Sequence, residues 1–157
     1  MKINLNNNET INFILSSSAK CWMGSGIINN TQVDFEIYEE RYNQSNIDWD
    51  YFQDFIFYLE GNNILPELIN KSQIILLALA ETIGYIIGDS EKISDFKMQF
   101  VGLSFQGQSK TGFTNGYSYS LWFNIANKNG NSNIDTYGAY IVDLESKYIV
   151  GAKREQC

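Results

Sequence analysis

The chain has 157 residues, of which 18 are acidic and 11 basic, and its formal net charge is -7 at pH 7. The length is that of one domain, and 44% of hydrophobic residues suffice for a core, so the sequence predicts a single globular domain over 1–157. The acidic balance argues against nucleic-acid binding, which needs clustered lysine and arginine, and the absence of histidine removes Ser-His-Asp, Cys-His and imidazole-ligated zinc sites.

The N-terminal part of the chain is predicted to form strands. Residues 9–16 and 31–40 have strand patterns, and in the second apolar and polar residues alternate, as in a sheet with one face in water. Between them, Gly24-Ser25-Gly26 predicts a turn, and 27–28 predicts a short additional strand.

Two helices are predicted next, because apolar residues then recur at helical spacing. The first covers 49–60, with Asp48 as its N-cap and Gly61 at its end. The second covers 65–88, with Pro66 in its first turn. Its second half is apolar on nearly all sides, which predicts a central buried helix.

The rest of the chain returns to strand patterns, at 96–105, 117–125, 136–144 and 148–153. In the first of these the apolar residues change face, which predicts a bulge near Gly102. Short connections between the late strands favour antiparallel pairing. The predicted fold is therefore α+β, a mainly antiparallel sheet with two consecutive helices inserted after the N-terminal strands, in the order βββ-αα-ββββ.

The sequence also predicts the compartment. It begins with no hydrophobic stretch of the length that a signal peptide needs, and the longest apolar run, 74–80, is too short to span a membrane. Cys21 and Cys157 make no disulfide framework and are interpreted as reduced thiols. We expect a cytoplasmic protein without a membrane segment.

The sequence predicts no catalytic residue, metal ligand or cofactor. Acidic and amide residues at 48–54 and at 127–135 lack the glycine or the terminal glutamate of a calcium loop. Asp34 and Glu36 share one face of a predicted strand at about 7 Å, as a carboxylate pair for glycoside hydrolysis could, but this spacing is common on solvated sheets.

The charge distribution is the most informative feature of the sequence. Residues 31–60 contain eight acidic residues and one basic residue, Arg41, with tyrosines among them. Acidic groups beside large amphipathic rings are typical of a surface that binds a basic protein. The predicted partner-binding residues are Asp34, Glu36, Tyr38, Glu39, Glu40, Tyr42, Asp50, Tyr51 and Asp54.

Other interpretations of the same sequence remain open at this point. The acidic segment can serve solubility alone, in a domain with a purely structural role. A small-ligand-binding domain is a second class, and an enzyme that uses only carboxylates such as Glu36 is a third. The sequence does not decide the oligomeric state. In the small-ligand alternative, a pocket on the sheet is lined by Tyr117, Tyr119, Trp122, Tyr137 and Tyr140.

A resemblance to a known class of proteins accompanies these features. The aromatic strands at 117–123 and 137–140 and the tail at 149–156, together with the size, the acidity and the inserted helix pair, resemble the immunity proteins of bacterial polymorphic-toxin systems. The resemblance implies a small α+β domain that binds a cognate toxin stoichiometrically and blocks it, with an acidic face that mimics nucleic acid or fills a basic active site.

Overall fold

The computed structural model describes residues 1–38, 47–84, 92–109 and 116–156. Its fold class is α+β, and the predicted order of strands, two helices and strands is confirmed, although five strands, not three, precede the helices. The strands before the helices are β1 (Lys2–Asn4), β2 (Thr10–Asn12), β3 (Ile14–Ser16), β4 (Cys21–Ile28) and β5 (Thr31–Tyr38). The helices are α1 (Trp49–Asn62), α2 (Leu65–Thr82) and the short 3-10 helix η2 (Ile93–Asp95). The strands after the helices are β6 (Phe96–Gln108), β7 (Tyr117–Asn127), β8 (Gly138–Glu145) and β9 (Tyr148–Gln156).

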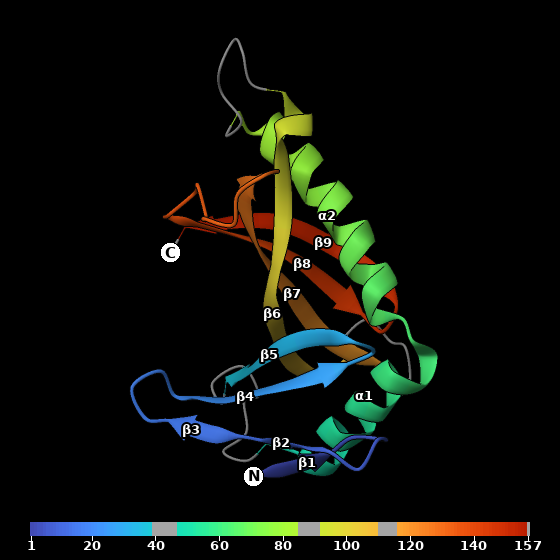
Figure 1. Ribbon diagram of the computed structural model, residues 1–157. Coiled ribbons are helices and arrows are strands. Elements are labelled where there is room, and N and C mark those ends of the chain that lie inside the picture. Colours follow the sequence, from blue (N-terminus) through green and yellow to red (C-terminus); the bar gives the residue numbers. More distant parts are fainter. Residues whose placement is uncertain (39–46, 85–91, 110–115, 157) are drawn as a thin grey trace.

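The strands form a seven-stranded sheet in the order β3-β4-β5-β6-β7-β8-β9, while β1 and β2 pair separately. All neighbours in the large sheet are antiparallel except β5 and β6, which are parallel. A parallel pair needs a long crossover, and α1 with α2 provides it. The prediction of a mainly antiparallel sheet is thus confirmed, with one parallel junction that joins an N-terminal block (β3–β5) to a C-terminal block (β6–β9) (Figure 1).

The two helices lie on the same side of this sheet (Figure 1). α2 packs across β6, β7, β8 and β9. α1 lies beside the N-terminal block and the β1-β2 pair, to which Gln53 is tied by two hydrogen bonds with the backbone of Asn4, 2.8 and 2.7 Å long. The prediction of a central buried second helix is wrong, because only one side of α2 meets the sheet. Ile74 and Ile75 on its other side are 64% and 38% exposed.

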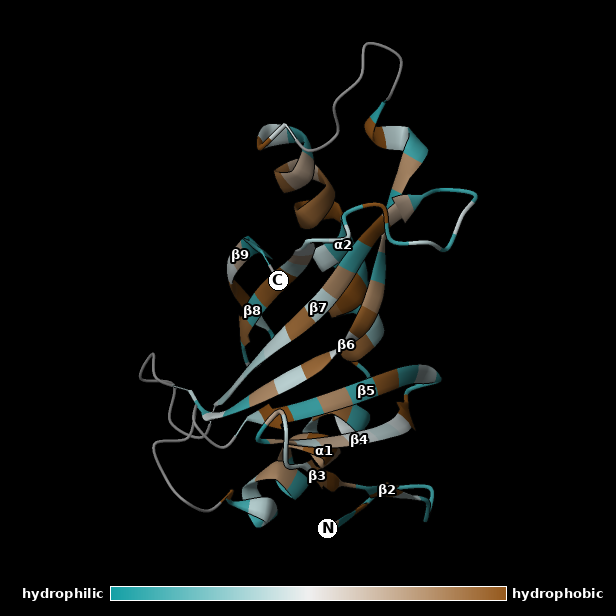
Figure 2. Cartoon of the chain, turned by 90° about the vertical axis from the view of Figure 1, so that its left-hand side faces the viewer, coloured by the Kyte–Doolittle hydropathy of each residue, from teal (hydrophilic) through white to brown (hydrophobic). Residues whose placement is uncertain are grey.

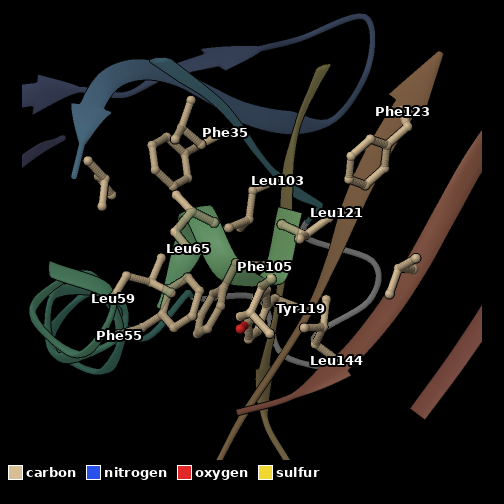
Figure 3. Close-up of a cluster of buried hydrophobic side chains, with 14 of the residues drawn as sticks. Phe35, Phe55, Leu59, Leu65, Leu103, Phe105, Tyr119, Leu121, Phe123 and Leu144 are labelled. Carbon is tan, nitrogen blue, oxygen red and sulfur yellow. The ribbon is translucent and has the colours of Figure 1, made fainter. Parts of the chain in front are cut away.

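The core between helices and sheet is strongly aromatic (Figure 3). Phe105 of β6 lies 5.0 Å from the ring of Phe52 and 4.7 Å from that of Phe55, measured between centroids, and both partners come from α1. Tyr119 of β7 lies 4.9 Å from Phe55. All four side chains are at most 1% exposed. Burial of such large rings makes this layer the main source of stability.

Several local predictions are confirmed. Asp48 caps α1, since its Oδ1 accepts a hydrogen bond of 3.0 Å from the backbone N–H of Tyr51. Pro66 lies in the first turn of α2, and β6 has a bulge between Phe100 and Gly102. Among the described residues, no helix has the length and hydrophobicity needed to cross a membrane.

Other local predictions are wrong. The predicted strand at 9–16 is divided between β2 and β3, which belong to different sheets. The predicted turn at Gly24-Ser25-Gly26 lies inside β4. These glycines allow close packing: a Cβ at Gly26 would lie 2.6 Å from Cγ1 of Ile11. The second helix ends at Thr82, and part of its predicted extension lies outside the described residues.

Candidate functional site

One face of the sheet carries none of the described helices, and alternation along β5 decides which residues lie there. Val33, Phe35 and Ile37 of this strand are at most 1% exposed and pack toward the helices. Asp34, Glu36 and Tyr38 alternate with them and therefore project from the opposite side. We call this side of the sheet the open face. Figure 2 views the molecule from this side, with the strands in front of the helices.

Backbone pairing arranges polar residues of the open face in a row across the sheet. Glu36 of β5 lies beside Ser104 of β6, and Ser104 pairs with Ser120 of β7. Ser120 in turn pairs with Asp143 of β8. Because residues directly opposite each other project to the same side, the row belongs to the open face and crosses the parallel junction.

A hollow of about 230 Å³ opens in this face where β6 passes between β5 and β7. It is lined by Asp34, Glu36, Tyr38, Val101, Gly102, Leu103 and Trp122. The bulge in β6 leaves Val101 44% exposed, and Gly102 places no side chain between β5 and the paired Trp122. A Cβ at Gly102 would lie 2.5 Å from the backbone oxygen of Asp34, so glycine allows β5 and β6 to approach this closely.

Hydroxyl groups hold the two carboxylates of the hollow. The Oγ of Ser25 donates a hydrogen bond of 2.6 Å to Oδ1 of Asp34, and the hydroxyl of Tyr38 donates one of 2.7 Å to Oε2 of Glu36. Within the described ranges, no lysine or arginine forms an ion pair with either carboxylate. The hollow therefore has fixed negative groups whose charge no side chain of the described ranges offsets.

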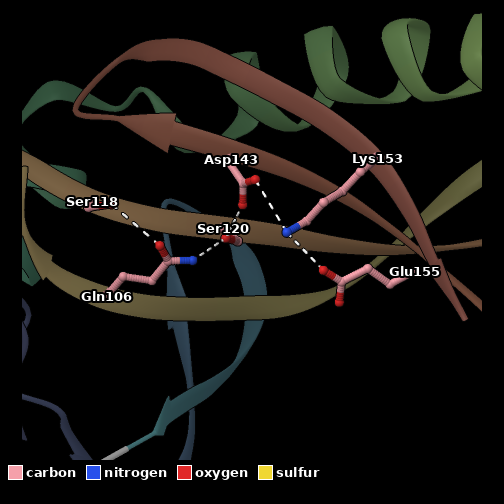
Figure 4. A network of polar contacts seen from close by, with 6 residues as sticks. All are labelled: Gln106, Ser118, Ser120, Asp143, Lys153 and Glu155. Atoms are coloured by element: carbon pink, nitrogen blue, oxygen red, sulfur yellow. Dashed lines mark hydrogen bonds and ion pairs between the residues drawn. The ribbon is translucent and has the colours of Figure 1, made fainter. Parts of the chain in front are cut away.

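A polar network extends from the row toward the sheet edge at β9 (Figure 4). Gln106 Nε2 donates to Ser120 Oγ over 2.5 Å, and Ser120 Oγ donates to Asp143 Oδ1 over 2.6 Å. Lys153 Nζ lies 3.6 Å from Asp143 Oδ2 and 2.8 Å from Glu155 Oε1. The hydrogen bond to Glu155 and the charge of Asp143 raise the pKa of Lys153. Since two carboxylates surround this ammonium, the network adds no positive field to the open face.

The nine predicted binding residues do not form one surface. Asp50 and Asp54 are exposed on α1, which packs on the other side of the sheet. Tyr51 is half-buried in the core: its hydroxyl donates to the backbone oxygen of Gly116 over 2.7 Å, and its ring lies 5.1 Å from that of Tyr117. Burial is the main cause that raises the pKa of Tyr51.

The remaining predictions have two outcomes. Asp34, Glu36 and Tyr38 are brought together on the open face, as described above. The predicted residues Glu39, Glu40 and Tyr42 lie outside the described residues.

The aromatic pocket considered for a small ligand does not form. Tyr119 and Tyr140 are both 0% exposed in the core, and burial raises their pKa values. Tyr137 is 69% exposed, and Tyr117 packs against α1. Trp122 is the member of this set that lines the hollow, on the other face of the sheet.

Trp122 and the β6 residues were missing from the predicted acidic site, although the sequence holds a signal for Trp122. In β7 the residues on the same face as Trp122 are Ser118, Ser120 and Asn124. One large ring among small polar side chains marks a position that the core does not use. The change of face near Gly102 predicts the bulge, but no signal gives Val101 and Gly102 a place in the site, because that place depends on the neighbouring strand β5.

The described residues offer neither a reactive thiol nor a metal site. Burial, and then the charge of Glu36, raise the pKa of the Cys21 thiol, so this group stays protonated and is a poor nucleophile. Within the described ranges, no group of three or more His, Cys, Asp or Glu residues is arranged to hold a metal ion.

Comparison with known proteins adds no relative: no protein-family model, no curated protein and no solved structure matches this chain. The function is therefore inferred from the geometry of the site.

Proposed function

We propose that the chain is a non-enzymatic binding domain that recognises a basic protein through the open face. The observation that carries this proposal is the hollow, where Asp34 and Glu36 lie together with Trp122 and no described basic side chain offsets the two carboxylates. Acidic groups beside an aromatic ring, without an ion-pair partner in the described part of the chain, favour a cationic partner, and the net charge of -7 accelerates the encounter with one.

The rest of the open face fits a protein partner better than a free small ion. Ile14 and Met23 pair across β3 and β4 and are 73% and 46% exposed, and Ile27 on the same face of β4 is 52% exposed. Protein interfaces combine such apolar groups with charges that choose the partner. In line with the resemblance noted in the sequence, we propose that the partner is a basic toxin, that binding blocks it, and that this occurs in the cytoplasm.

Two double variants with equal changes in charge test the proposal. Asp34→Asn/Glu36→Gln removes two charges from the open face, and Asp50→Asn/Asp54→Asn removes two from α1. Tagged wild-type and variant chains are used to capture proteins from a lysate of the source organism at low and at high salt. Native mass spectrometry of each sample records any small molecule that remains bound.

We expect a basic protein to be captured by the wild type and by the α1 variant, to be lost from the open-face variant, and to bind less at high salt. Equal capture by both variants would contradict a role for the open face. A retained small molecule with no captured protein would support the small-ligand alternative.

A further inference from the structure

We infer that the hollow is the binding site for a single arginine side chain of the basic partner. This inference rests on the proposed function for the nature of the partner and adds the chemical group that it inserts. Three features support it: the arrangement of the two carboxylates, the buried hydroxyl of Ser104 beside Glu36, and the aromatic lining and size of the hollow.

The carboxylates are oriented before any partner arrives. Asp34 and Glu36 each use one oxygen to accept a hydrogen bond from a neighbouring hydroxyl, at 2.6 and 2.7 Å. Each retains a second oxygen as an acceptor. A guanidinium has five N–H donors in one plane and can bond to two carboxylates at once, whereas an ammonium acts as a compact, strongly hydrated charge. Two fixed carboxylates therefore favour arginine over lysine.

A buried serine hydroxyl next to Glu36 indicates that the site is incomplete. The Oγ of Ser104 has no hydrogen-bond partner in the described part of the chain, and this residue is 0% exposed. Its side chain projects to the open face beside Glu36. A buried hydroxyl that lacks a bond costs free energy, and an inserted N–H donor would remove that cost.

The ring of Trp122 and the volume of the hollow fit one side chain. Arginine stacks on aromatic rings, and tryptophan gives the strongest cation–π contact. Pockets for small-molecule ligands have volumes of about 300 to 1,000 Å³. The hollow measures about 230 Å³, below that range. An arginine that enters it would remain attached to a protein surface covering the exposed apolar residues around it.

The test uses the full chain labelled with ¹⁵N and three blocked tripeptides, Gly-Arg-Gly, Gly-Lys-Gly and Gly-citrulline-Gly. Citrulline keeps the shape of arginine without its charge. The readout is the indole N–H signal of Trp122, assigned from a Trp122→Phe variant. Trp22 and Trp49 serve as internal controls, because their rings pack together at 5.2 Å on the helix side of the sheet.

We expect the arginine peptide to shift the Trp122 signal and to bind about tenfold tighter than the citrulline peptide, with the lysine peptide between them. Asp34→Asn/Glu36→Gln should weaken arginine binding about tenfold, and Asp50→Asn/Asp54→Asn should leave it unchanged. Unchanged Trp22 and Trp49 signals in each variant establish that it is folded.

Three outcomes would overturn the inference of an arginine site: no shift of the Trp122 signal with the arginine peptide, an equal affinity for the citrulline peptide, or an equal affinity for the lysine peptide. If one of them occurs while Asp34→Asn/Glu36→Gln fails to capture the basic protein that the wild type captures, the proposed function stands and only the inference of an arginine site fails. If the arginine peptide binds but no variant affects capture, the proposed function fails by itself.

Discussion

The two faces of the seven-stranded sheet are built from alternate residues of the same strands, yet they differ in burial and in polarity. The helix side of β5, β6 and β7 carries Phe35, Phe105 and Tyr119, all at most 1% exposed. The open face of these strands carries carboxylates, serines and Trp122. One set of side chains stabilises the fold, and the other carries the proposed binding site. Substitutions can therefore separate the two roles, even at neighbouring positions.

The largest effect on stability is expected at the helix side. Phe105→Ala should lower the free energy of unfolding by about 3–5 kcal/mol, because it leaves a cavity beside Phe52 and Phe55. Trp122→Ala on the open face should cost less, since its ring is partly exposed. Chemical denaturation of both variants measures the difference. Equal losses would show that the open face also carries the packing of the fold.

The two faces meet at Gly102, where substitution should have an intermediate effect. Gly102→Ala forces a Cβ to within 2.5 Å of the backbone oxygen of Asp34 and should destabilise the chain by about 1–3 kcal/mol. Gly61→Ala in α1 is the matched control: outside the adjoining residues and the helix's own backbone, no atom lies within 4 Å of its added Cβ, and alanine should stabilise the helix by about 0.5–1 kcal/mol. Thermal unfolding of both variants tests the opposite signs.

Acidic residues on the two sides should differ slightly in their effect on stability. Asp50 lies in the first turn of α1, where a negative charge interacts favourably with the helix dipole, so Asp50→Asn should cost about 0.5 kcal/mol. Asp34→Asn should leave stability unchanged, because the amide oxygen can still accept the bond from Ser25. Urea unfolding at low ionic strength compares the two. A larger loss for Asp34→Asn would mean that the open-face charges serve the fold.

The smallest effect is expected at an ion pair that belongs to neither face. Lys71 lowers the pKa of Glu67 on the exposed side of α2, first through a hydrogen bond and then through its charge. A lowered pKa in the folded state means that the contribution of Glu67 is present above its ordinary pKa of about 4.3 and is lost as the pH falls through the folded value. NMR titration should give Glu67 a lower midpoint than an isolated glutamate, and Lys71→Met should raise it. An unchanged midpoint in Lys71→Met would contradict the pairing.

The features that the sequence predicted correctly are those encoded locally. The alternation in β5, the helical spacing with its cap at Asp48, and the bulge near Gly102 each depend on neighbouring residues. The parallel pairing of β5 with β6 has no local signal, because its partners lie on either side of two helices. The glycines of β4 predicted a turn, since the residue that packs against Gly26, Ile11, lies on another strand.

The candidate site shows the same limit. Acidic residues of β5 and α1 are close in the sequence and predicted one surface. In the fold the strand directs Asp34 to the open face, while α1 presents Asp54 on the other side of the sheet. Charge density along a chain becomes charge density on a surface only when the intervening structure keeps the residues on one side. Trp122, distant in sequence, completes the hollow instead.

The parallel junction between β5 and β6 also has a consequence for folding kinetics. The pairs within each antiparallel block are consecutive in the chain, and hairpins of this kind form within about 1–10 μs. Pairing of Phe35 with Leu103 must close a much longer loop that contains both helices, and closing it costs more entropy. We therefore expect the blocks to dock late. The hollow draws on both blocks, so it exists only after docking, and any molecule that binds there will recognise the completed fold and shift the equilibrium toward it.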